Sequence, residues 1–388
     1  MDITIHPGKL SGTVAAVPSK SQAHRLLICA AFADGKTTLI CPETNRDIEA
    51  TAECLTALGA AVSRTETGYR ISPVSKIPKS AVLNCQESGS TLRFLLPIAG
   101  ALGVDATFQM AGRLPQRPLS PLWEEMERMG CSLSLPTPDT IRCTGKLRPG
   151  CYCIDGGVSS QFITGLLFAQ ALMEGCSTLE VTGNTESRPY IQMTQDALAL
   201  FDAPHFHTPG TIAVEGDWSS GAFWLAARAL GSDLRVTGLD PDSSQGDRAV
   251  TGLLPMLKNH CTISAADIPD LIPILAVVAA CNQGAQFTDI RRLRSKESDR
   301  VASTIAMIQA LGGRAEADET TMTIHGTGLS GGIVDSHNDH RIAMASAVAA
   351  TVCNRDVTIL GAQCVTKSYP KFWEEYRRLG GNYELNLR

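Results

Sequence analysis

Apolar residues at helical spacing recur along the chain, and each run begins with a small polar cluster. In the first run, Ser19 is followed three residues later by Gln22, which fits a capping box. Lys20 and Ser21 are therefore expected in the first turn of a helix that extends to about Ala33. Six such starts occur, in "PSKSQAHRLLICAAF", "ESGSTLRFLLPIAGAL", "GGVSSQFITGLLFAQAL", "GDWSSGAFWLAARAL", "KESDRVASTIAMIQAL" and "NDHRIAMASAVAATV".

A second repeated pattern places Gly and another small residue after the apolar run, as in "ALGAAV", "RMGCSL", "ALGGRA" and "RLGGNY". Glycine in this position suits the left-handed turn that ends a helix and leads into a strand. Short β-type runs lie between the helices: "TTLI", "YRISP", "ATFQM", "STLEV", "TIAVEG", "LRVTG", "AQFTDI", "TMTIHG" and "DVTIL". The alternation predicts an α/β protein built from about six copies of one β/α module.

Two of these modules are shorter than the others. Between Leu200 and Glu215 only "FDAPHFHTPGTIAV" separates a helix from the next strand, and between Met256 and Asp270 only "LKNHCTISAADIP" does. We expect the sheets of these two modules to have one strand fewer than their siblings.

Length and composition limit the classes of protein that are possible. A chain of 388 residues suggests two domains, and 44% hydrophobic with 19% charged residues is typical of a soluble globular protein. We find no stretch that predicts a membrane span, signal peptide or transit peptide, and we expect a cytoplasmic protein. The 13 cysteines lie mostly in apolar stretches without paired C-x-x-C spacing, so we expect buried, reduced thiols and no zinc.

The net charge of −5 argues against a general surface for nucleic acid or anionic membranes. Any cationic site must therefore be local. The helix starts and neighbouring turns hold such a set: Lys20, Arg25, Arg93, Arg117, Arg188, Lys296, Arg300, Arg341 and Lys367. Ser88, Ser90, Ser159, Ser160 and Ser187 add hydroxyl donors of the kind that phosphate oxygens accept. The pattern indicates an anionic ligand, although capped helices with solvated cations are the simpler alternative for any single cluster. No glycine pattern matches a Walker A loop or a dinucleotide fingerprint.

Two acids stand among these cations. Glu297 lies in "RSKESDR", and Asp270 follows a proline in "DIPDLIP". Each could act as a general base, and each could equally be an N-terminal acid stabilised by a helix dipole. "SHNDHR" at 336 to 341 contains two His and one Asp but lacks a third ligand on a common helix face, so we expect no metal there.

Eleven short motifs in order resemble the 5-enolpyruvylshikimate-3-phosphate synthase family of enolpyruvyl transferases over essentially the whole chain. They are "SKSQAHR", "ESGSTLR", "QRPLSPL", "DGGVSSQF", "SRPY", "EGDWSS", "QGD", "IPD", "KESDR", "NDHRIAM" and "TKSYP". The resemblance implies two similar lobes, each of three β/α units with helices inside and sheets outside, an arrangement called an inside-out α/β barrel. It implies one lobe from residues 1–16 and 217–388, a second from 17–216, and an active site in the cleft between them.

The implied reaction transfers the enolpyruvyl group of phosphoenolpyruvate to the 5-hydroxyl of shikimate 3-phosphate and releases phosphate through a tetrahedral intermediate. The two substrates together carry about six negative charges near neutral pH, which accounts for a cationic site in an acidic protein. The resemblance implies no metal or organic cofactor, no nucleic-acid or membrane partner, and a monomer.

Site residues follow from the matched positions. The resemblance implies that shikimate 3-phosphate is held by Ser21, Arg25, Ser159, Ser160, Gln161, Ser187, Asp270 and Lys296. It implies that phosphoenolpyruvate is held by Lys20, Gly89, Arg117, Gln161, Arg300, Arg341 and Lys367. In this assignment Asp270 accepts the proton of the 5-hydroxyl, and Glu297, with Lys20 or Lys367, manages proton transfer at the enol methylene and the leaving phosphate.

This chain departs from the family pattern in two places. Gln86 and Glu87 stand where many members carry Gly-Asn, which places an acid near the expected phosphoenolpyruvate site, and Arg292 stands where an Asn often touches the first substrate. Two other functions stay open at this point. One is the sister enzyme that acts on UDP-N-acetylglucosamine, although residues 105–121 contain no cysteine placed as its reactive thiol would be. The other is an anion-binding relative without activity.

Overall fold

The computed structural model describes residues 1–386 and divides into two compact units. Unit 1 comprises Met1–Val17 and Gly216–Arg388, and unit 2 comprises Pro18–Glu215. Each unit has its own hydrophobic core and three sheets, so we describe each unit by itself.

Unit 2 contains a complete copy of the module. Ser88 caps the N-terminus of its first helix by accepting a hydrogen bond from Thr91 N at 3.2 Å, and Gly103 ends that helix with a φ of 71°. The first two strands pair in parallel, and a hairpin then adds two antiparallel strands, giving the order β6-β7-β9-β8. The elements are β6 (Ser80–Asn84), α3 (Gly89–Leu102), β7 (Asp105–Gln109), η1 (Leu114–Gln116), α4 (Leu122–Arg128), β8 (Cys131–Thr137) and β9 (Thr140–Gly145).

The other two modules of unit 2 are variations on this plan. One forms the sheet β12-β3-β5-β4, in which β12 returns from the far end of the unit to pair with β3, and the other forms only the pair β10-β11. The elements of the first are α1 (Lys20–Ala31), β3 (Thr37–Ile40), α2 (Arg46–Ala57), β4 (Ala61–Thr65), β5 (Gly68–Ser72) and β12 (Thr211–Ala213). Those of the second are β10 (Cys151–Asp155), α5 (Ser160–Leu172), β11 (Thr178–Thr182) and α6 (Arg188–Leu200).

Unit 1 has the same three kinds of sheet. The complete module forms β14-β15-β17-β16, the N-terminal strand β1 completes β18-β19-β1-β20, and β13-β2 is a pair. The complete module contains β14 (Cys261–Ser264), α9 (Ile272–Ala280), β15 (Ala285–Thr288), η3 (Arg291–Ser295), α10 (Arg300–Ala310), β16 (Arg314–Ala317) and β17 (Met322–His325). The module completed by β1 (Asp2–His6) contains β18 (Gly332–Asp335), α11 (His340–Ala349), β19 (Val357–Leu360), η4 (Ala362–Lys367), α12 (Phe372–Arg378) and β20 (Asn382–Asn386). The short module contains β2 (Ser11–Ala15), α7 (Trp218–Ala229), β13 (Asp233–Thr237), η2 (Gly246–Ala249) and α8 (Val250–Met256).

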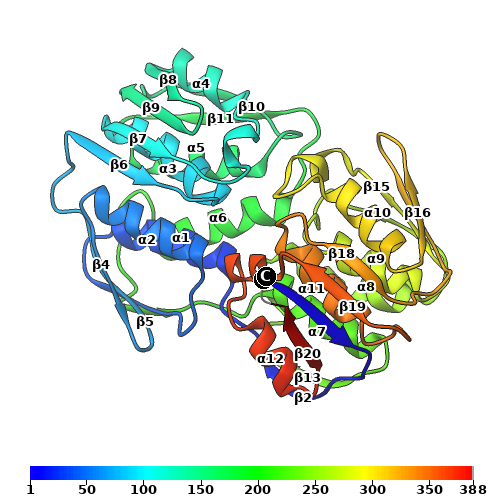
Figure 1. Ribbon diagram of the computed structural model, residues 1–388. Helices are drawn as coiled ribbons and strands as arrows, with labels where there is room; N and C mark the ends of the chain where they lie inside the picture. Colours follow the sequence, from blue (N-terminus) through cyan, green and yellow to red (C-terminus); the bar gives the residue numbers. More distant parts are fainter. Residues whose placement is uncertain (387–388) are drawn as a thin grey trace. The chain divides into compact units, whose positions relative to one another are not determined.

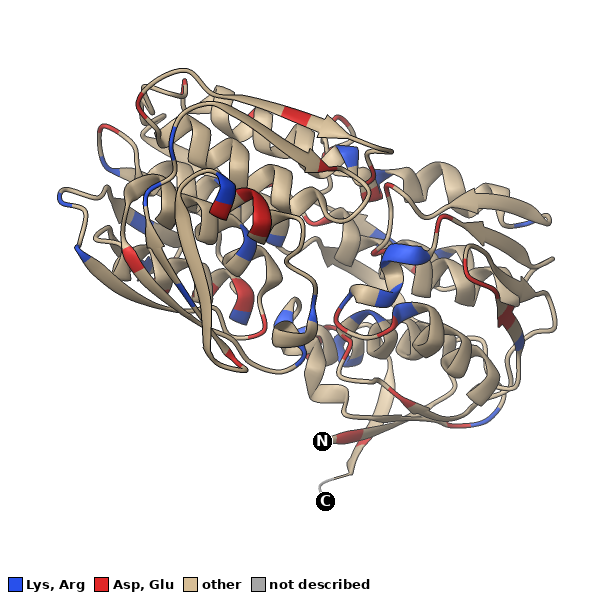
Figure 2. Cartoon of the chain, turned by 90° about the horizontal axis from the view of Figure 1, so that it is seen from above, with Lys and Arg blue, Asp and Glu red and all other residues tan. Residues whose placement is uncertain are grey.

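Helices fill the interior of each unit, and the sheets cover them. In unit 2, α3 packs against α5, and α1 packs against α2 and α6, while β4, β5, β8 and β9 lie toward the outside (Figure 1). In unit 1, α9 packs against α11 and α7, and all nine of its residues are buried. Charged residues lie mainly on loops and helix ends, whereas long stretches of the helices carry none (Figure 2). This burial explains why the helices read as long apolar runs in the sequence.

The two short modules differ from our expectation in one respect. Their sheets have two strands where the complete modules have four, so the loss is a whole hairpin and not one strand. The expectation of a single missing strand was wrong: among the described residues, neither strand of the hairpins β8-β9 and β16-β17 has a counterpart in the short modules.

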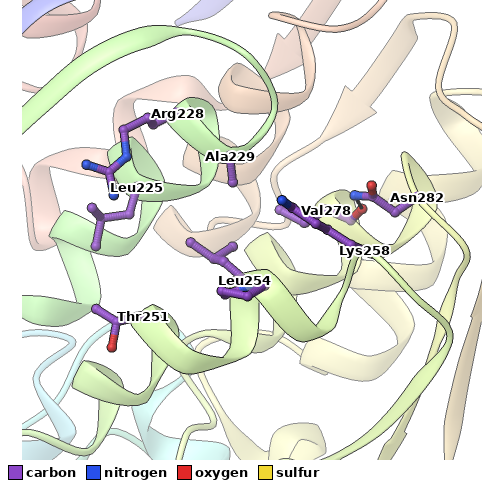
Figure 3. A pocket seen from close by; sticks show the side chains of 9 residues that line it. Leu225, Arg228, Ala229, Thr251, Leu254, Lys258, Val278 and Asn282 are labelled. Atoms are coloured by element: carbon purple, nitrogen blue, oxygen red, sulfur yellow. Dashed lines mark hydrogen bonds between the residues drawn. The ribbon is translucent and has the colours of Figure 1, made fainter.

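The missing hairpin of unit 1 has a structural consequence. In the complete module, β16 packs on α10 and β17 packs on α9, but in the described residues no hairpin follows α8. The ends of α7, α8 and α9 there border a cavity of about 400 Å³ (Figure 3). Leu225, Leu254 and Val278 line it, and Arg228 and Lys258 lie at its wall.

Several expectations from the sequence are confirmed. Helices begin close to all six predicted starts, although the first ends at Ala31, two residues early. Gly59, Gly130, Gly312 and Gly380 all adopt positive φ after a helix, as the repeated glycine pattern predicts.

The cysteines follow the expectation only in part. All 13 are free thiols, and most are buried, but Cys151, Cys153 and Cys176 are exposed. The first two lie on β10, which alternates between exposed and buried residues in a sheet of only two strands. In the part of the chain that the structure describes, no helix is long and apolar enough to cross a membrane.

Candidate functional site

The predicted site residues fall into two groups, one in each unit. The serine-rich cluster of unit 2 comprises Lys20, Ser21, Arg25, Gly89, Arg93, Arg117, Ser159, Ser160, Gln161 and Ser187. The arginine–carboxylate cluster of unit 1 comprises Asp270, Lys296, Glu297, Arg300, Asp339, Arg341 and Lys367. In both, helix N-termini supply many of the members, which is where backbone N–H groups and the helix dipole favour anions.

The start of α1 shows how local sequence positions functional groups. Ser19 Oγ accepts a hydrogen bond from Gln22 N at 3.3 Å, which is half of the predicted capping box. Gln22 does not return the bond to Ser19, because its Oε1 accepts from Glu215 N at 2.7 Å. The cap fixes Lys20 at the first helical position, and its ammonium lies 2.9 Å from Asp47 Oδ2 in the first turn of α2.

Arg25 is a buried cation of unit 2. It is 2% exposed, and its guanidinium donates to Thr194 Oγ1 at 2.9 Å and to the carbonyl oxygens of Tyr190 and Ser21 at 2.7 and 2.6 Å. A longer bond reaches Thr164 Oγ1 at 3.4 Å. Burial lowers the pKa of Arg25 to about 10. Because every acceptor is neutral among the described residues, the positive charge is oriented but not neutralised, as an anion site requires.

The start of α3 brings together two further arginines. A Cβ atom on Gly89 would lie 2.6 Å from Arg93 Nη1 and 2.8 Å from Arg117 Nη1, so the glycine permits both guanidinium groups to approach the backbone. Arg93 is held by Gln161 Oε1 at 3.0 Å and by Pro118 O at 3.1 Å. Gln161 also donates to Ser90 Oγ at 3.0 Å, which joins α5 to α3.

The serines of unit 2 occupy two other helix starts. Ser159 caps α5 by accepting a hydrogen bond from Gln161 N at 3.3 Å, and Ser160 follows it in the first turn, buried. Ser187 precedes α6 with a φ of 56°, a left-handed conformation that is strained for a residue with a side chain. Such strain is often found where a backbone must present a group to a ligand.

Arg300 organises the cluster of unit 1. It is the first residue of α10, is 0% exposed, and makes ion pairs with three carboxylates. Its Nε contacts Asp339 Oδ2 at 3.0 Å, its Nη1 contacts Asp270 Oδ1 at 2.6 Å, and its Nη2 contacts Glu297 Oε2 at 2.8 Å. Burial would lower the pKa of Arg300, but the three carboxylates raise it.

Asp270 bridges two arginines. Its Oδ2 lies 3.1 Å from Arg341 Nη2, and its other oxygen contacts Arg300. Partial burial would raise the pKa of Asp270, yet Arg341, Arg300 and Lys296 outweigh it and hold the pKa well below its ordinary value. In the free protein Asp270 is therefore an ionised but weak base. An anion that shares its arginines would make it more basic.

The two lysines of this cluster have different surroundings. The protein packed around half-buried Lys296, with the charge of Arg292 beside it, lowers the pKa of its ammonium to about 7. Lys367 ends η4, is buried, and donates to Asn338 O at 2.8 Å, just before α11 begins.

Two residues of these networks were not among the predicted site residues, although Asp339 was considered as a metal ligand in "SHNDHR". Asp47 pairs with Lys20, and Asp339 accepts hydrogen bonds from Arg300, Ser298 and the backbone of Arg341. Asp339 caps α11, so its place directly before an apolar helical run was a signal that could have identified it. Nothing local marked Asp47 as the partner of Lys20, because that contact joins two helices.

One departure from the family pattern lies in the turn before α3, and the other, Arg292, lies in η3. Gln86 adopts a φ of 51°, a conformation that favours glycine, which many members carry at this position. The Glu87 carboxylate lies against Gly112, where a Cβ atom would approach its Oε2 to 2.5 Å. Within residues 1–386 no group of three or more His, Cys, Asp or Glu side chains is arranged to hold a metal ion.

Comparisons with known proteins match this chain to one enzyme family over nearly its full length. Residues 5–263 and 255–376 match the family described as EPSP synthase (3-phosphoshikimate 1-carboxyvinyltransferase). The chain is 38% identical to a 3-phosphoshikimate 1-carboxyvinyltransferase from Clostridium kluyveri over 98% of each chain. It is 35% identical to one from Clostridium beijerinckii over 99% of this chain and 98% of the relative.

The sequence alignment and the fold indicate the same family. The first of these alignments extends over 419 positions, more than the 388 residues of this chain, so the relative carries segments that this chain lacks. An EPSP synthase structure from Acinetobacter baumannii superposes with a TM-score of 0.79 at 23% identity and covers 100% of both chains. The predicted α/β fold class is thereby confirmed. On its sequence and its fold together, the chain belongs to the EPSP synthase family.

Proposed function

We propose that the protein transfers the enolpyruvyl group of phosphoenolpyruvate to the 5-hydroxyl of shikimate 3-phosphate and releases phosphate. The proposal makes it a 3-phosphoshikimate 1-carboxyvinyltransferase of the shikimate pathway, which leads to chorismate and the aromatic amino acids. One observation carries it: within each unit, the residues that the family resemblance assigns to the reaction lie in cationic networks suited to anions.

The acceptor substrate is assigned first. We propose that Ser21, Arg25, Ser159, Ser160, Gln161 and Ser187 of unit 2 hold shikimate 3-phosphate, together with Asp270 and Lys296 of unit 1. The un-neutralised charge of Arg25 supports this assignment, because its four hydrogen bonds to neutral acceptors fix the guanidinium without cancelling its charge.

The donor substrate is assigned to the remaining cations. We propose that Lys20, Gly89, Arg117 and Gln161 of unit 2, and Arg300, Arg341 and Lys367 of unit 1, bind phosphoenolpyruvate. Arg341 supports this part: it is buried, and its Nε and Nη1 atoms have no hydrogen-bond acceptor among the described residues. Each of these buried N–H groups can donate a hydrogen bond to an oxygen of a bound anion.

The chemistry follows in two steps. In the addition step, the 5-oxygen attacks C2 of phosphoenolpyruvate while Asp270 accepts the hydroxyl proton. An acid delivers a proton to C3, which gives the tetrahedral intermediate. In elimination, a base removes a proton from that methyl group, the C2–O bond to phosphate breaks, and the enol ether forms. We assign the proton transfers at C3 and the leaving phosphate to Glu297 with Lys20 or Lys367.

The geometry of Asp270 fits this sequence of events. Arg300 and Arg341 hold its carboxylate ionised in the free protein. When the anionic donor binds to the same arginines, their pull on Asp270 weakens and its pKa rises. Asp270 therefore becomes a stronger base when the substrate that needs it is present.

Phosphate release tests the proposal. We expect the purified protein to release phosphate from phosphoenolpyruvate when shikimate 3-phosphate is added. Phosphate release with UDP-N-acetylglucosamine instead would identify the sister transferase. No phosphate release with either acceptor would indicate an anion-binding relative. We further propose a cytoplasmic monomer, which fractionation of the source cells and sedimentation would check.

Two variants test the roles. Lys20→Ala should abolish turnover, whereas Glu297→Gln should still bind shikimate 3-phosphate but turn over far more slowly. Lys79→Ala is the control, because Lys79 is exposed in the same unit as Lys20 and belongs to neither cluster. Turnover at the wild-type rate in the Lys20 or Glu297 variant would refute that residue's assignment.

A further inference from the structure

Asp247 is a buried acid that the proposed reaction does not use. It lies in η2 and is 1% exposed. Its Oδ2 accepts a short hydrogen bond from Ser219 Oγ at the start of α7. Its Oδ1 is buried without a hydrogen-bond partner, and no ion pair involves this residue among those the structure describes. An ionised carboxylate in such a position would be strongly destabilised.

The charged groups that face Asp247 come from three neighbouring elements. Asp217 caps α7, Asp270 precedes α9, and Arg341 lies in the first turn of α11. Helix α8, which follows η2, has no charged side chain, and Arg248 on η2 itself is exposed and bonds to Pro241 O. Two acids and one cation thus surround a third acid.

Arg341 does not neutralise Asp247. Its Nη2 contacts Asp270 at 3.1 Å, while its Nε and Nη1 are buried and have no acceptor within the described part of the chain. The nearby carboxyl group of Asp247 therefore leaves these two N–H groups open. Open, desolvated N–H donors of this kind are what the oxygens of an incoming carboxylate or phosphate would use.

We propose that Asp247 is a positioning residue for phosphoenolpyruvate: it carries a proton when that anion binds, so that the open N–H groups of Arg341 remain available to the anion. The inference rests on the proposed function in one respect, namely that Arg341 binds phosphoenolpyruvate. It adds that binding of this substrate is coupled to proton uptake at a residue that does not touch it.

The electrostatics of Asp247 support this role. Burial, with the negative charge of Asp270, raises its pKa from the ordinary value of 3.8 to about 7, against the opposing effects of Ser219 and Arg341. Asp247 therefore exchanges its proton near neutral pH. An anion on Arg341 adds negative charge and offsets the attraction of that arginine, which raises the pKa further and draws in a proton.

The pH dependence has a definite sign. Below about pH 7 Asp247 is mostly protonated and the affinity for phosphoenolpyruvate is independent of this group. Above about pH 7 the proton must come from solution, so the affinity falls by up to about tenfold for each pH unit. The neutral isostere in Asp247→Asn needs no proton.

The principal test is the KM for phosphoenolpyruvate between about pH 6 and pH 9, at saturating shikimate 3-phosphate. We expect the wild-type KM to rise about tenfold per unit above pH 7, and the Asp247→Asn profile to be nearly flat. At the alkaline end the variant should therefore bind phosphoenolpyruvate more tightly than the wild type. The ionisation of the substrate affects the KM of both proteins equally, so it cancels when the two pH profiles are compared. An unchanged slope in Asp247→Asn would overturn the inference.

Asp242→Asn is the matched control, since Asp242 is an exposed acid on the segment that precedes η2. It should keep the wild-type profile. If Asp247→Asn does not fold, Ser219→Ala replaces it: loss of the hydrogen bond that favours the ionised form should move the break in the KM profile to higher pH. A break at the wild-type pH in that variant would count against the inference.

An activity-independent readout separates this inference from the proposed function. Infrared difference spectra of the wild type against Asp247→Asn at neutral pH should contain the carbonyl band of a protonated carboxyl group. Absence of the band with normal phosphate release would refute the role of Asp247 alone. Absence of phosphate release with the band present would refute the proposed function and leave the protonation of Asp247 established.

Discussion

Arg25 in the second turn of α1 and Arg300 at the start of α10 are both buried guanidinium groups, yet their partners differ completely. Arg25 donates to hydroxyl and carbonyl oxygens, whereas Arg300 makes ion pairs with Asp270, Glu297 and Asp339. Burial lowers the pKa of Arg25 to about 10, and the carboxylates raise that of Arg300. Among the described residues, Arg25 has no carboxylate partner for its positive charge, whereas Arg300 has three.

The difference shows two ways to build an anion site from buried cations. The serine-rich cluster fixes a charge with neutral groups and leaves the counter-ion to be supplied by the ligand. The arginine–carboxylate cluster keeps its charges paired, and a ligand must share the arginines with acids already present. We therefore expect substitutions and pH to affect the two clusters differently.

The largest effect is expected from removing the arginines themselves. Arg300→Met leaves three carboxylates without their common partner and should lower the free energy of unfolding by about 3–5 kcal/mol. Arg25→Met leaves only neutral acceptors and should lower it by about 1–2 kcal/mol. Urea unfolding of both variants gives the comparison directly. Equal losses would show that the charge balance of the two sites does not differ as their hydrogen bonds indicate.

Crowding the backbone at the start of α3 should have the next largest effect. Gly89→Ala places a methyl group against Arg93 and Arg117, and because Arg93 is tied to Gln161 and Pro118, we expect Arg117 to move. The KM for phosphoenolpyruvate should rise by about ten- to a hundredfold, corresponding to an overpacking cost of about 1–3 kcal/mol.

The control for this variant comes from the other unit. Gly252→Ala also replaces a helical glycine, but no atom lies within 4 Å of the added Cβ. Its kinetics should match those of the wild type. A Gly89→Ala enzyme with an unchanged KM would show that the approach of the two arginines to this backbone is unimportant for the donor substrate.

A smaller effect is expected from the pH dependence of Lys296. Its pKa of about 7 lies below the ordinary value, so the ammonium charge is present at lower pH and is lost as the pH rises through 7. The affinity for shikimate 3-phosphate, measured by calorimetry, should therefore fall by up to about tenfold per unit above pH 7. Lys296→Arg keeps its charge and should remove this decline. A decline that persists in Lys296→Arg would assign it to another group.

The smallest effect concerns the cap of α1. Ser19→Ala removes the acceptor for Gln22 N and should lower the free energy of unfolding by about 1 kcal/mol. Ser19→Thr keeps an acceptor oxygen and should lose much less. Because the cap also fixes the position of Lys20, a modest loss of kcat should accompany the loss of stability. A Ser19→Ala protein as stable as the wild type would contradict the capping role.

Much of the fold could be predicted from the pattern of apolar and polar residues. The interior helices were found because they are apolar on nearly every side and begin with capping residues. The nine β-type runs fall on β3, β5, β7, β11, β12, β13, β15, β17 and β19, whereas the parallel partners β2, β6, β10, β14 and β18 were missed. Several hairpin strands were missed. β4 and β16 are mostly exposed, so they lack the alternation that marks a half-buried strand.

The candidate site could be predicted less completely. Arg300 and Asp270 were both recognised, but their contact joins residues 30 positions apart. In the sequence, Asp247 was noted only within the motif "QGD", and no role was predicted for it. Its burial and its lack of an ion pair depend on η2, α7 and α11 meeting, and no local pattern specifies that meeting.

The sequence by itself determined the repeated modules, the cationic helix starts, and a family resemblance that the comparisons confirm. These features are local or lie in order along the chain, and capping, periodicity and glycine turns encode them within a few residues. Only the tertiary structure decided which charges are paired: among the described residues Arg300 makes ion pairs with three acids, whereas Arg25 and Asp247 make none. The physical reason is that burial makes a charge depend on its neighbours in space, and those neighbours come from distant parts of the chain.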